Sequence, residues 1–493
     1  MQTLESVSVD PRRWRALLVV LAGTFMAVLD AFIVNVALPP IQQDLHTSFA
    51  QVQLVLAGYT LAYAVGLITG GRLGDIFGRK RMFQLGMLGF TCTSLLCGLA
   101  PEPPFLIASR VIQGLTASLM IPQVLSIIQV SFQGNERTKA FGIYGAVIGI
   151  ASILGQVLGG ILITSNLFGL GWRNVFLVNV PVGIIALIAG FFFIKESTTN
   201  ENRKLDLIGV VLIALTLTLF VYPLTDGRDT GWPLWIILCL LLSMPLFITF
   251  ILYERHLSHT AITPLLPLNL FKERRFTLGI IIALAYYGEN AALFFTLVLF
   301  LQVGHGFSPL SSGLTFIPLG LGSFISSILM PRIVTRFGLT VLRYGSVLLI
   351  LGDVGAIFVV QHIGDTLHNG IPLFPVFLCV GLGQGLVGTP LVNAALSTIP
   401  SRYTGAASGV LSTVTQISNV LGVAFIGLIF FGLLGSQVQM QAGLVQQYYS
   451  QAFVASLYAL IVMAAITFFL SSLLCRNKTG KVALANDRVN IIE

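Results

Sequence analysis

Long apolar runs limit what this chain can fold into. Fourteen of them, each about 20 residues long, follow one another along the 493 residues, separated by shorter polar segments. An apolar helix of that length crosses the hydrocarbon core of a bilayer, where a helix satisfies its own backbone hydrogen bonds. The sequence therefore predicts an all-α, polytopic membrane protein with 14 transmembrane helices.

Two long polar breaks divide these runs into three groups. The runs before the first break are 16–38, 52–70, 82–99, 105–128, 140–164 and 175–194. The runs between the breaks are 207–224 and 234–253. The runs after the second break are 276–302, 310–330, 339–361, 371–399, 405–434 and 452–474. Composition agrees with this reading, because 9% of the residues are charged, against roughly 25% in soluble domains.

Basic residues alternate between the two sides that these spans define. If the N-terminus is cytoplasmic, the loops on its side carry nearly all the lysine and arginine, and the opposite loops carry only Arg173 and Arg228. Positive loops stay in the cytoplasm, so we expect both termini inside and a multi-pass protein of the plasma (inner) membrane. The net charge of +8 is then explained by orientation, and we expect no nucleic-acid partner.

The chain also resembles itself at an offset of 260 residues. GRLGDIFGR at 71–79 aligns with PRIVTRFGL at 331–339, and at nearly that offset Asp30 corresponds to Glu289. Each carboxylate would lie about 20 Å along its helix at about 1.5 Å per residue, deep in the bilayer. We therefore expect two six-helix halves with two helices inserted between them. The predicted divisions are a first half (1–200), the inserted pair (201–260), a second half (261–475) and a cytoplasmic tail (476–493).

The stretch GRLGDIFGRKR, residues 71–81, predicts a tight charged hairpin between the second and third spans. Its glycines allow close approach of backbones, and its single carboxylate can pair with the cations that follow. Such a hairpin lies too far from the bilayer centre to contact cargo there, so we expect it to control conformational change. The residues with this expected role are Gly71, Gly74, Asp75, Gly78, Arg79, Lys80 and Arg81.

Four charged residues stand out inside the predicted spans, namely Asp30, Arg110, Glu289 and Asp353. A charge at the centre of a bilayer costs at least ~2.5 kcal/mol, so such residues usually face the protein interior or an aqueous cavity. A carboxylate within reach of Arg110 is a candidate proton carrier, and Asp30 is better placed for this role than Glu289. A purely structural ion pair is the alternative.

Aromatic residues surround Glu289 in the sequence. Tyr286, Tyr287 and Phe294 lie within five positions of it, and this setting could hold a lipophilic cation by ion pairing and cation–π contact. We therefore expect Glu289 to bind substrate, and Asp30 to couple transport to protons.

With these motifs the chain resembles the fourteen-helix drug:proton antiporter group of the major facilitator superfamily. LDAFIVNVALP at 29–39 is similar to the first-span motif of that group, and it carries Asn35 as a further substrate-binding candidate. RVIQG at 110–114 resembles the fourth-span motif, whose arginine is implicated in proton coupling. The loop stretch at 71–81 resembles the signature between spans 2 and 3, with Ile76 where that pattern often has a cation.

The fifth-span antiporter motif is matched incompletely by ASILGQVLGG at 151–160. Gly155, Gly159 and Gly160 are kept as gating candidates, whereas Gln156 stands where the family usually has proline. The roles of Gln113, Gln156 and Asp353 stay open at this point.

Motifs for other chemistry are missing. The five cysteines form no CxxC pattern, the histidines are poorly placed as metal ligands, and no P-loop, HExxH or GxSxG is present. We therefore expect no enzyme, metal or cofactor, and a proton gradient as the energy source. The expected function is export of lipophilic, often cationic, drugs in exchange for protons by alternating access, by a protein that works as a monomer. The alternatives are a dedicated metabolite exporter, or a facilitator or importer of a defined solute on the same fold; a non-transporting receptor is a third class.

Overall fold

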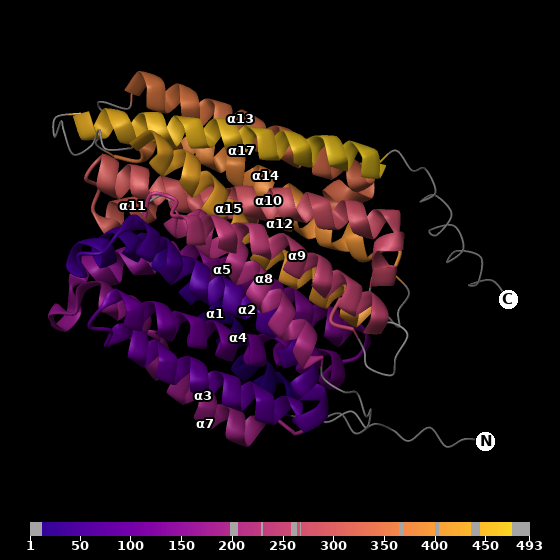
Figure 1. Ribbon diagram of the computed structural model, residues 1–493. Helices are drawn as coiled ribbons and strands as arrows, with labels where there is room; N and C mark the ends of the chain where they lie inside the picture. Colours follow the sequence, from indigo (N-terminus) through magenta and orange to yellow (C-terminus); the bar gives the residue numbers. More distant parts are fainter. Residues whose placement is uncertain are drawn as a thin grey trace, which may run out of the picture.

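Helices make up all the regular secondary structure that the computed structural model describes (Figure 1). The described residues are 12–197, 206–227, 230–257, 264–266, 268–363, 369–399, 404–434 and 444–475. Within them no strand occurs, so the predicted all-helical class is confirmed. The predicted tail, 476–493, lies outside the described residues.

The helices follow the predicted runs closely. The first group comprises α1 (Arg13–Asp44), α2 (Phe49–Phe77), α3 (Arg79–Gly98), α4 (Pro103–Ser131), α5 (Gly134–Ser165), α6 (Asn174–Leu177) and α7 (Asn179–Phe193). The next two are α8 (Leu207–Asp226) and α9 (Leu234–Leu257). The last group comprises α10 (Arg274–Leu299), α11 (Pro309–Thr315), α12 (Ile317–Phe337), α13 (Val341–Ile363), α14 (Phe374–Leu396), α15 (Thr404–Leu434) and α17 (Val445–Cys475). The short turns are η1 (Leu167–Gly169), η2 (Gly171–Arg173), η3 (Leu268–Lys272), η4 (Phe300–Gly304), η5 (Gly338–Thr340) and η7 (Ile371–Leu373).

Thirteen helical stretches of the described chain are long and apolar enough to cross a membrane. The protein is therefore a multi-pass membrane protein. The predicted span at 82–99 coincides with α3, a helix of 20 residues that is not one of the thirteen. Its first turn carries three cations and its interior carries Thr91, Thr93 and Ser94, which make it less apolar than the others. The count of fourteen is thus not confirmed.

The hairpin predicted at residues 71–81 is much shorter than expected. Helix α2 continues through Asp75 to Phe77, and α3 begins at Arg79, so Gly78 alone links them. Gly78 has φ +104°, a backbone conformation that residues with a side chain rarely adopt. The glycine therefore permits a direct turn from one helix into the next.

The helices gather into two sides of one bundle. Helices α1 to α7 lie together in Figure 1, where α2 packs on α4, α3 on α4 and α7, and α1 on α5 and α7. Helices α10 to α17 lie on the other side, where α10 packs on α14, α15 and α17, and α14 packs on α12 and α13. The sides meet where α2 contacts α15 and where α5 contacts α11, and α8 packs against both α2 and α15.

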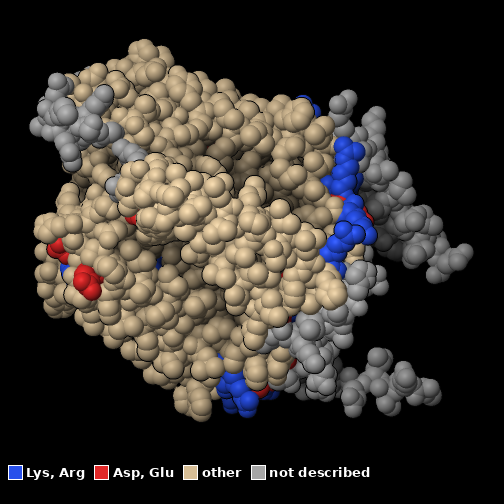
Figure 2. Space-filling view, in the orientation of Figure 1, with Lys and Arg blue, Asp and Glu red and all other residues tan. Residues whose placement is uncertain are grey.

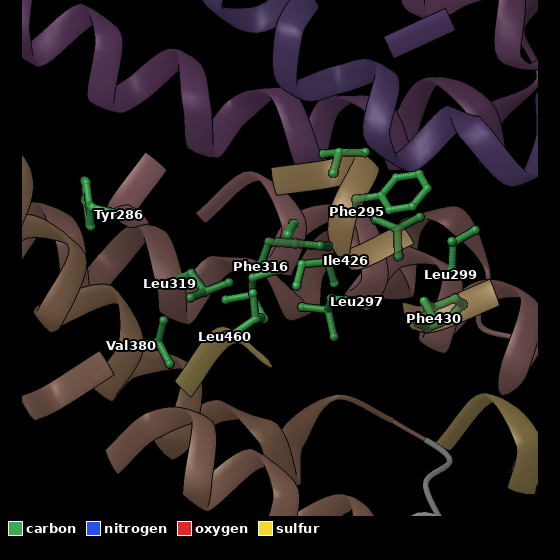
Figure 3. Close-up of a cluster of buried hydrophobic side chains, with 14 of the residues drawn as sticks. Tyr286, Phe295, Leu297, Leu299, Phe316, Leu319, Val380, Ile426, Phe430 and Leu460 are labelled. Carbon is green, nitrogen blue, oxygen red and sulfur yellow. The ribbon is translucent and has the colours of Figure 1, made fainter. Parts of the chain in front are cut away.

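Two large clusters of buried apolar side chains hold these sides together. One joins residues of α1, α3, α4 and α7, such as Phe83 and Phe90. The other is built mainly from α10 to α17 and also takes in the second half of α1. Figure 3 shows part of this second cluster, in which Ile426 lies between Phe295 and Leu460. Burial on this scale fixes the inner helices and leaves their polar side chains in defined positions.

Charge is concentrated at one end of the bundle. Figure 2 shows lysine and arginine gathered at the end where α1 and α3 begin, with the long sides of the bundle nearly free of charge. We call this the cationic end. At the opposite end, Arg173 is the one lysine or arginine among the described residues, and it pairs with Asp44 at 2.6 Å. The uncharged sides, such as α9 with exposed Leu234 and Leu241, suit contact with lipid chains.

Candidate functional site

A cavity of about 1330 Å³ lies between the two sides of the bundle. At the cationic end it reaches Arg72 and Asp75 of α2, Arg79 at the start of α3 and Glu273 just before α10. Deeper, it is bordered by Asn35 and by residues of α4, α5, α10, α14 and α15. None of the described residues of α8 and α9 lines it, so these two helices lie outside the cavity wall.

The inner wall of the cavity carries no charge among the described residues. The four charged residues that line the cavity as a whole all lie at the cationic end. Farther in, polar character comes from tyrosine hydroxyls and side-chain amides, mixed with aliphatic and phenylalanine side chains. The tyrosines are Tyr59, Tyr63, Tyr144 and Tyr287, and the amides include Asn35, Asn290, Gln416 and Asn419. Such a wall can stack on aromatic rings and hydrogen-bond with neutral polar groups.

Contacts between the sides close the cavity toward the opposite end. Phe294 of α10 packs edge-on against Phe32 of α1, with ring centres 5.5 Å apart. Beyond it, the Nε2 atom of Gln302 donates to the carbonyl oxygen of Val36 at 3.0 Å. The cavity is therefore accessible from the cationic end and sealed at the other.

Beside the cavity lies a buried ion pair, which joins the two charged residues expected to handle protons. The Nη1 atom of Arg110 on α4 lies 2.5 Å from Oδ2 of Asp30 on α1, and both side chains are fully buried. Helix α1 positions Asp30 near its middle, and α4 brings Arg110 to the same depth by packing against α2 and α3. A buried pair of this kind is sensitive to loss of either partner, because the remaining charge would be uncompensated.

Amide side chains surround this ion pair. The Nε2 atom of Gln113 donates to Oδ1 of Asp30 at 3.1 Å and to Oγ of Ser94 at 2.8 Å, while its Oε1 accepts from Arg110 at 2.7 Å. Asn179 of α7 donates to the same Oδ1 atom at 3.1 Å. Four helices thus fix the carboxylate, and Gln113, whose role the sequence left open, belongs to this network.

Tyr59 separates the ion pair from the cavity. The guanidinium of Arg110 lies over its ring, 4.2 Å from the ring centre, and the Nε atom of Arg110 donates to the carbonyl oxygen of Val55 on the same helix α2. Because Tyr59 also lines the cavity, one aromatic ring stands between cargo space and the buried charges. The sequence did not single out Tyr59, Ser94 or Asn179.

The substrate-binding residues expected on α10 fall on two faces of the helix. Tyr287 and Phe294 line the cavity, together with Asn290, as positions i, i+3 and i+7 of a helix should. Glu289 and Tyr286 are not among the lining residues. They lie on the other face, where the Tyr286 hydroxyl donates to the carbonyl oxygen of Gln384 at 2.8 Å. The expected contact between Glu289 and cargo is therefore absent from this conformation, and a binding role for it stays a prediction.

Two intramembrane carboxylates are buried away from the cavity. Glu289 and Asp353 are fully buried, and neither carboxylate accepts a hydrogen bond within the described part of the chain. Asp353 lies on α13, which packs on α14 and α17. Its role stays open.

The charged stretch at the cationic end forms a cluster of ion pairs and hydrogen bonds between Asp75, Arg79, Lys80, Arg81 and Glu196, which we call the clasp. Asp75 pairs with Arg79 at 2.9 Å across the link between α2 and α3, while Gly71 lines the cavity and Gly74 lies against the Gln123 side chain. The backbone N–H groups of Lys80 and Arg81 donate to the Glu196 carboxylate, at 3.0 and 3.2 Å. A carboxylate at a helix N-terminus is favourable for the helix dipole. Sequence reasoning missed Glu196, which appeared only as part of a polar break.

The glycines of the fifth-span motif bring α5 close to two other helices. Gly155 and Gly159 lie against Ile33 of α1, and Gly160 lies against the backbone of Pro309 in α11. Gln156, in place of proline, is 1% exposed, and its amide atoms have no partner among the described residues. Because Gln156 keeps its backbone N–H, α5 runs unbroken through this motif.

A further ion pair joins α1 and α5 at the cationic end. Arg13 donates to both oxygens of Glu136, at 2.8 and 3.1 Å, and these hydrogen bonds lower the pKa of Glu136. The pair therefore persists down to lower pH than an ordinary glutamate would allow. Among the described residues there is no cluster of three potential metal ligands.

Comparison with known proteins places this geometry in context. Residues 20–423 match the Major Facilitator Superfamily. The chain is 38% identical over 430 residues to the "Probable actinorhodin transporter" of Streptomyces coelicolor, covering 86% of this chain and 74% of that protein. It is 33% identical over 427 residues to the "Tetracenomycin C resistance and export protein" of Streptomyces glaucescens, covering 86% and 77%. It is 31% identical over 421 residues to the "Multidrug resistance protein Stp" of Mycobacterium tuberculosis, covering 85% and 76%.

Solved structures share the fold. A bacterial homologue of the human lysosomal transporter Spinster, in an inward-facing and unoccupied conformation, superposes with a TM-score of 0.66 at 17% identity, covering 94% of this chain and 98% of that one. The helical bundle, the central cavity and the sequence relatives thus agree. The chain belongs to the major facilitator superfamily, whose members are membrane transporters of small molecules.

Proposed function

We propose that this protein exports lipophilic small molecules in exchange for protons by alternating access, and that Asp30 carries the proton. One observation carries the proposal above the others. A fully buried Asp30–Arg110 pair, with 2.5 Å between its charged atoms, lies one tyrosine ring away from a large cavity. Proton exchange needs a carboxylate whose surroundings change between two access states, and a carboxylate of α1 that is held by side chains of α4 and α7 meets that need.

Exchange of protons for cargo follows because a proton and the Arg110 guanidinium compete for the Asp30 carboxylate. When Asp30 is ionised, Arg110, Gln113 and Asn179 hold it, as in the conformation open at the cationic end. A proton taken up on Asp30 from the other side removes its negative charge and releases Arg110 from the pair. Arg110 stays cationic and must then find other partners, which destabilises the arrangement open to the other side. Return to the conformation described here expels the proton at the cationic end and leaves the cavity free for cargo.

The proposed cargo is lipophilic and hydrogen-bonding, and mainly uncharged. Relatives carry names that specify antibiotics as cargo or as the agent resisted, which supports toxic compounds as the general class. The expectation of often cationic cargo rested on Glu289, which does not line the cavity. Tyrosines and amides on the uncharged inner wall favour selection by ring stacking and hydrogen bonding.

We also propose the finer architecture. Helix α3 would be the fourteenth span, because it coincides with the predicted run at 82–99 and packs on α4 and α7. Residues 1–200 and 261–475 would form the two halves, and 201–260 the inserted pair. The cationic end would face the cytoplasm of a bacterial cell at its plasma membrane, by the positive-inside rule. The protein would work as a monomer, without a cofactor, on the energy of the proton gradient.

Flux in proteoliposomes tests this function. Purified protein is reconstituted, a pH gradient is imposed, and movement of a panel of lipophilic compounds is followed with and without a protonophore. We expect uphill movement of at least one compound that stops when the gradient is collapsed, and that is lost in Asp30→Asn. Movement that is indifferent to the gradient would instead identify a facilitator, the alternative named above.

A further inference from the structure

A second pair of buried carboxyl groups lies away from the cavity, at the cationic end of the α8–α9 hairpin. Asp206 is the N-cap of α8, where its Oδ1 atom accepts from the backbone N–H of Gly209 at 2.8 Å. Glu254 lies near the end of α9, and its Oε2 atom accepts from the backbone N–H of Leu266 at 3.0 Å. The residues are 3% and 0% exposed. Each carboxyl group therefore uses one oxygen to hold a backbone N–H.

The two remaining oxygens face each other. Oδ2 of Asp206 and Oε1 of Glu254 both lie within 2.8 Å of the point that a Cβ atom on Gly209 would occupy. Neither atom has a hydrogen-bond partner within the described chain. Two buried carboxyl oxygens placed this close to one point can both be satisfied only if a proton lies between them, because an ionised carboxylate only accepts.

We propose that Asp206 and Glu254 form a proton-binding site in which the two carboxyl groups share one proton. The shared proton satisfies both facing oxygens and leaves the pair with a single negative charge. Two ionised carboxylates at this range in a buried site would repel strongly.

The surroundings of the pair are mainly apolar. Val65, Ile213, Leu217, Phe250 and Leu265 form a small buried cluster against which α8 and α9 pack. The titratable and charged groups nearby are the hydroxyl of Tyr253, which interacts with Asp206, and Arg72 of α2, which donates to the carbonyl oxygen of Pro264 at 2.9 Å. Arg255 and His256 of the same turn of α9 are exposed.

The site is connected to the wall of the transport cavity. Pro264 and Leu265 line that cavity, and the segment that contains them is held on one side by Arg72 and on the other by Glu254 through Leu266. Loss of the shared proton leaves two like charges, which move apart, so the Glu254 carboxylate is displaced and its hydrogen bond from the Leu266 N–H lengthens. The position of this part of the cavity wall is therefore linked to cytoplasmic pH, independently of which ion drives export.

Infrared difference spectroscopy on the full-length protein in lipid nanodiscs tests the shared proton. The C=O stretching band of protonated carboxyl groups is followed from acid to alkaline pH in the wild type, Asp206→Asn and Glu254→Gln. Each amide can donate to the facing carboxylate, so both variants should fold. At pH 7, where ordinary exposed carboxyl groups are ionised, we expect the same one-carboxyl loss of band intensity in either variant, and no loss in Glu102→Gln, which alters an exposed carboxylate at the opposite end. An undiminished band in both variants, or a loss in only one, would overturn the shared proton.

Hydrogen exchange of the Leu266 amide gives a second readout that needs no variant. After correction for the intrinsic effect of pH, we expect protection of Leu266 to fall over the pH range in which the infrared band disappears. In Glu254→Gln the protection should no longer follow pH over that range. Protection in the wild type that stays constant while the band disappears would refute the link to the cavity wall. Neither readout depends on transport, so the proposed export function can fail while this site stands, or the reverse.

Discussion

The guanidinium carbon of Arg110 lies 4.2 Å from the ring centre of Tyr59, and that tyrosine is also part of the cavity wall. Cargo in the cavity would touch the ring on one side while the buried charge touches it on the other. Binding and the Asp30–Arg110 pair are thereby connected through a single side chain. This arrangement leads to the first prediction.

Replacing Tyr59 by leucine should weaken coupling between cargo and protons. The substitution removes a cation–π contact worth about 1–2 kcal/mol at a desolvated site, so we expect pH-driven transport to fall roughly tenfold. Tyr59→Phe keeps the ring and loses only a long hydrogen bond of 3.4 Å to the carbonyl oxygen of Ala27. It should stay within about twofold of the wild type. Initial rates of gradient-driven flux measure both, and equal losses in the two variants would contradict a role for the ring.

Two neighbouring tyrosines on α10 test which face binds cargo. Tyr287 lines the cavity, whereas Tyr286 does not and instead donates to the carbonyl oxygen of Gln384. Tyr287→Leu should raise the Kd of an aromatic substrate roughly tenfold, because stacking and apolar contact are worth about 1–2 kcal/mol. Tyr286→Phe should leave that Kd unchanged while lowering thermal stability slightly through the lost hydrogen bond. Isothermal titration in detergent gives the affinities, and a larger effect of Tyr286→Phe on Kd would assign binding to the other face.

Loss of the Asp75–Arg79 pair should change the conformational cycle without changing cargo affinity. Asp75 lies at the cationic end of α2, where it is paired at 2.9 Å. In Asp75→Asn we expect slower turnover, with a Kd within about twofold of the wild type, because exchange between access states depends on this clasp. Distances between spin labels on α2 and α15 report that exchange. If affinity fell in proportion to transport while exchange stayed normal, Asp75 would belong to the binding site.

Gln302 should stabilise the sealed end. Its side chain donates to the Val36 carbonyl oxygen and ties α10 to α1, a hydrogen bond worth about 1 kcal/mol. Gln302→Ala should shift the population toward states open at the opposite end, which increases alkylation of a cysteine placed at Asn35 by a membrane-impermeant reagent added only on the side of the opposite end. Gln129→Ala is a suitable control, because Gln129 lines the cavity near the cationic end. Equal alkylation in the wild type and Gln302→Ala would show that other contacts seal this end.

Much of the fold could be predicted from the sequence, because apolar length alone identifies helices that cross a membrane. The exception is α3, whose Thr91, Thr93 and Ser94 lower its apolar character; two of these hydroxyls bond to the helix backbone and Ser94 bonds to Gln113. The short link at Gly78 was also missed, because composition signals a turn without giving its length.

Residues of the candidate site were predicted only where a charged side chain falls inside a predicted membrane span. Asp30 and Arg110 stand out because an unpaired charge in a bilayer is costly, and the structure brings them together. Asn179 and Tyr59 are common residue types in apolar runs, and only packing between distant helices places them beside that pair. Glu289 was identified from the sequence, but the face of α10 on which it lies was not. Residues that are neighbours in the sequence, such as Tyr287 and Glu289, lie on different faces of that helix.

Proton release on substrate addition tests the central claim most directly. Protein in detergent, in weakly buffered solution with a pH indicator, is mixed with a neutral substrate of the flux assay, and bound substrate is measured in parallel. We predict release of protons from the wild type and from Glu289→Gln, and no release from Asp30→Asn at matched substrate occupancy. Release from Asp30→Asn equal to that of the wild type, together with its loss in Glu289→Gln, would contradict Asp30 as the proton carrier.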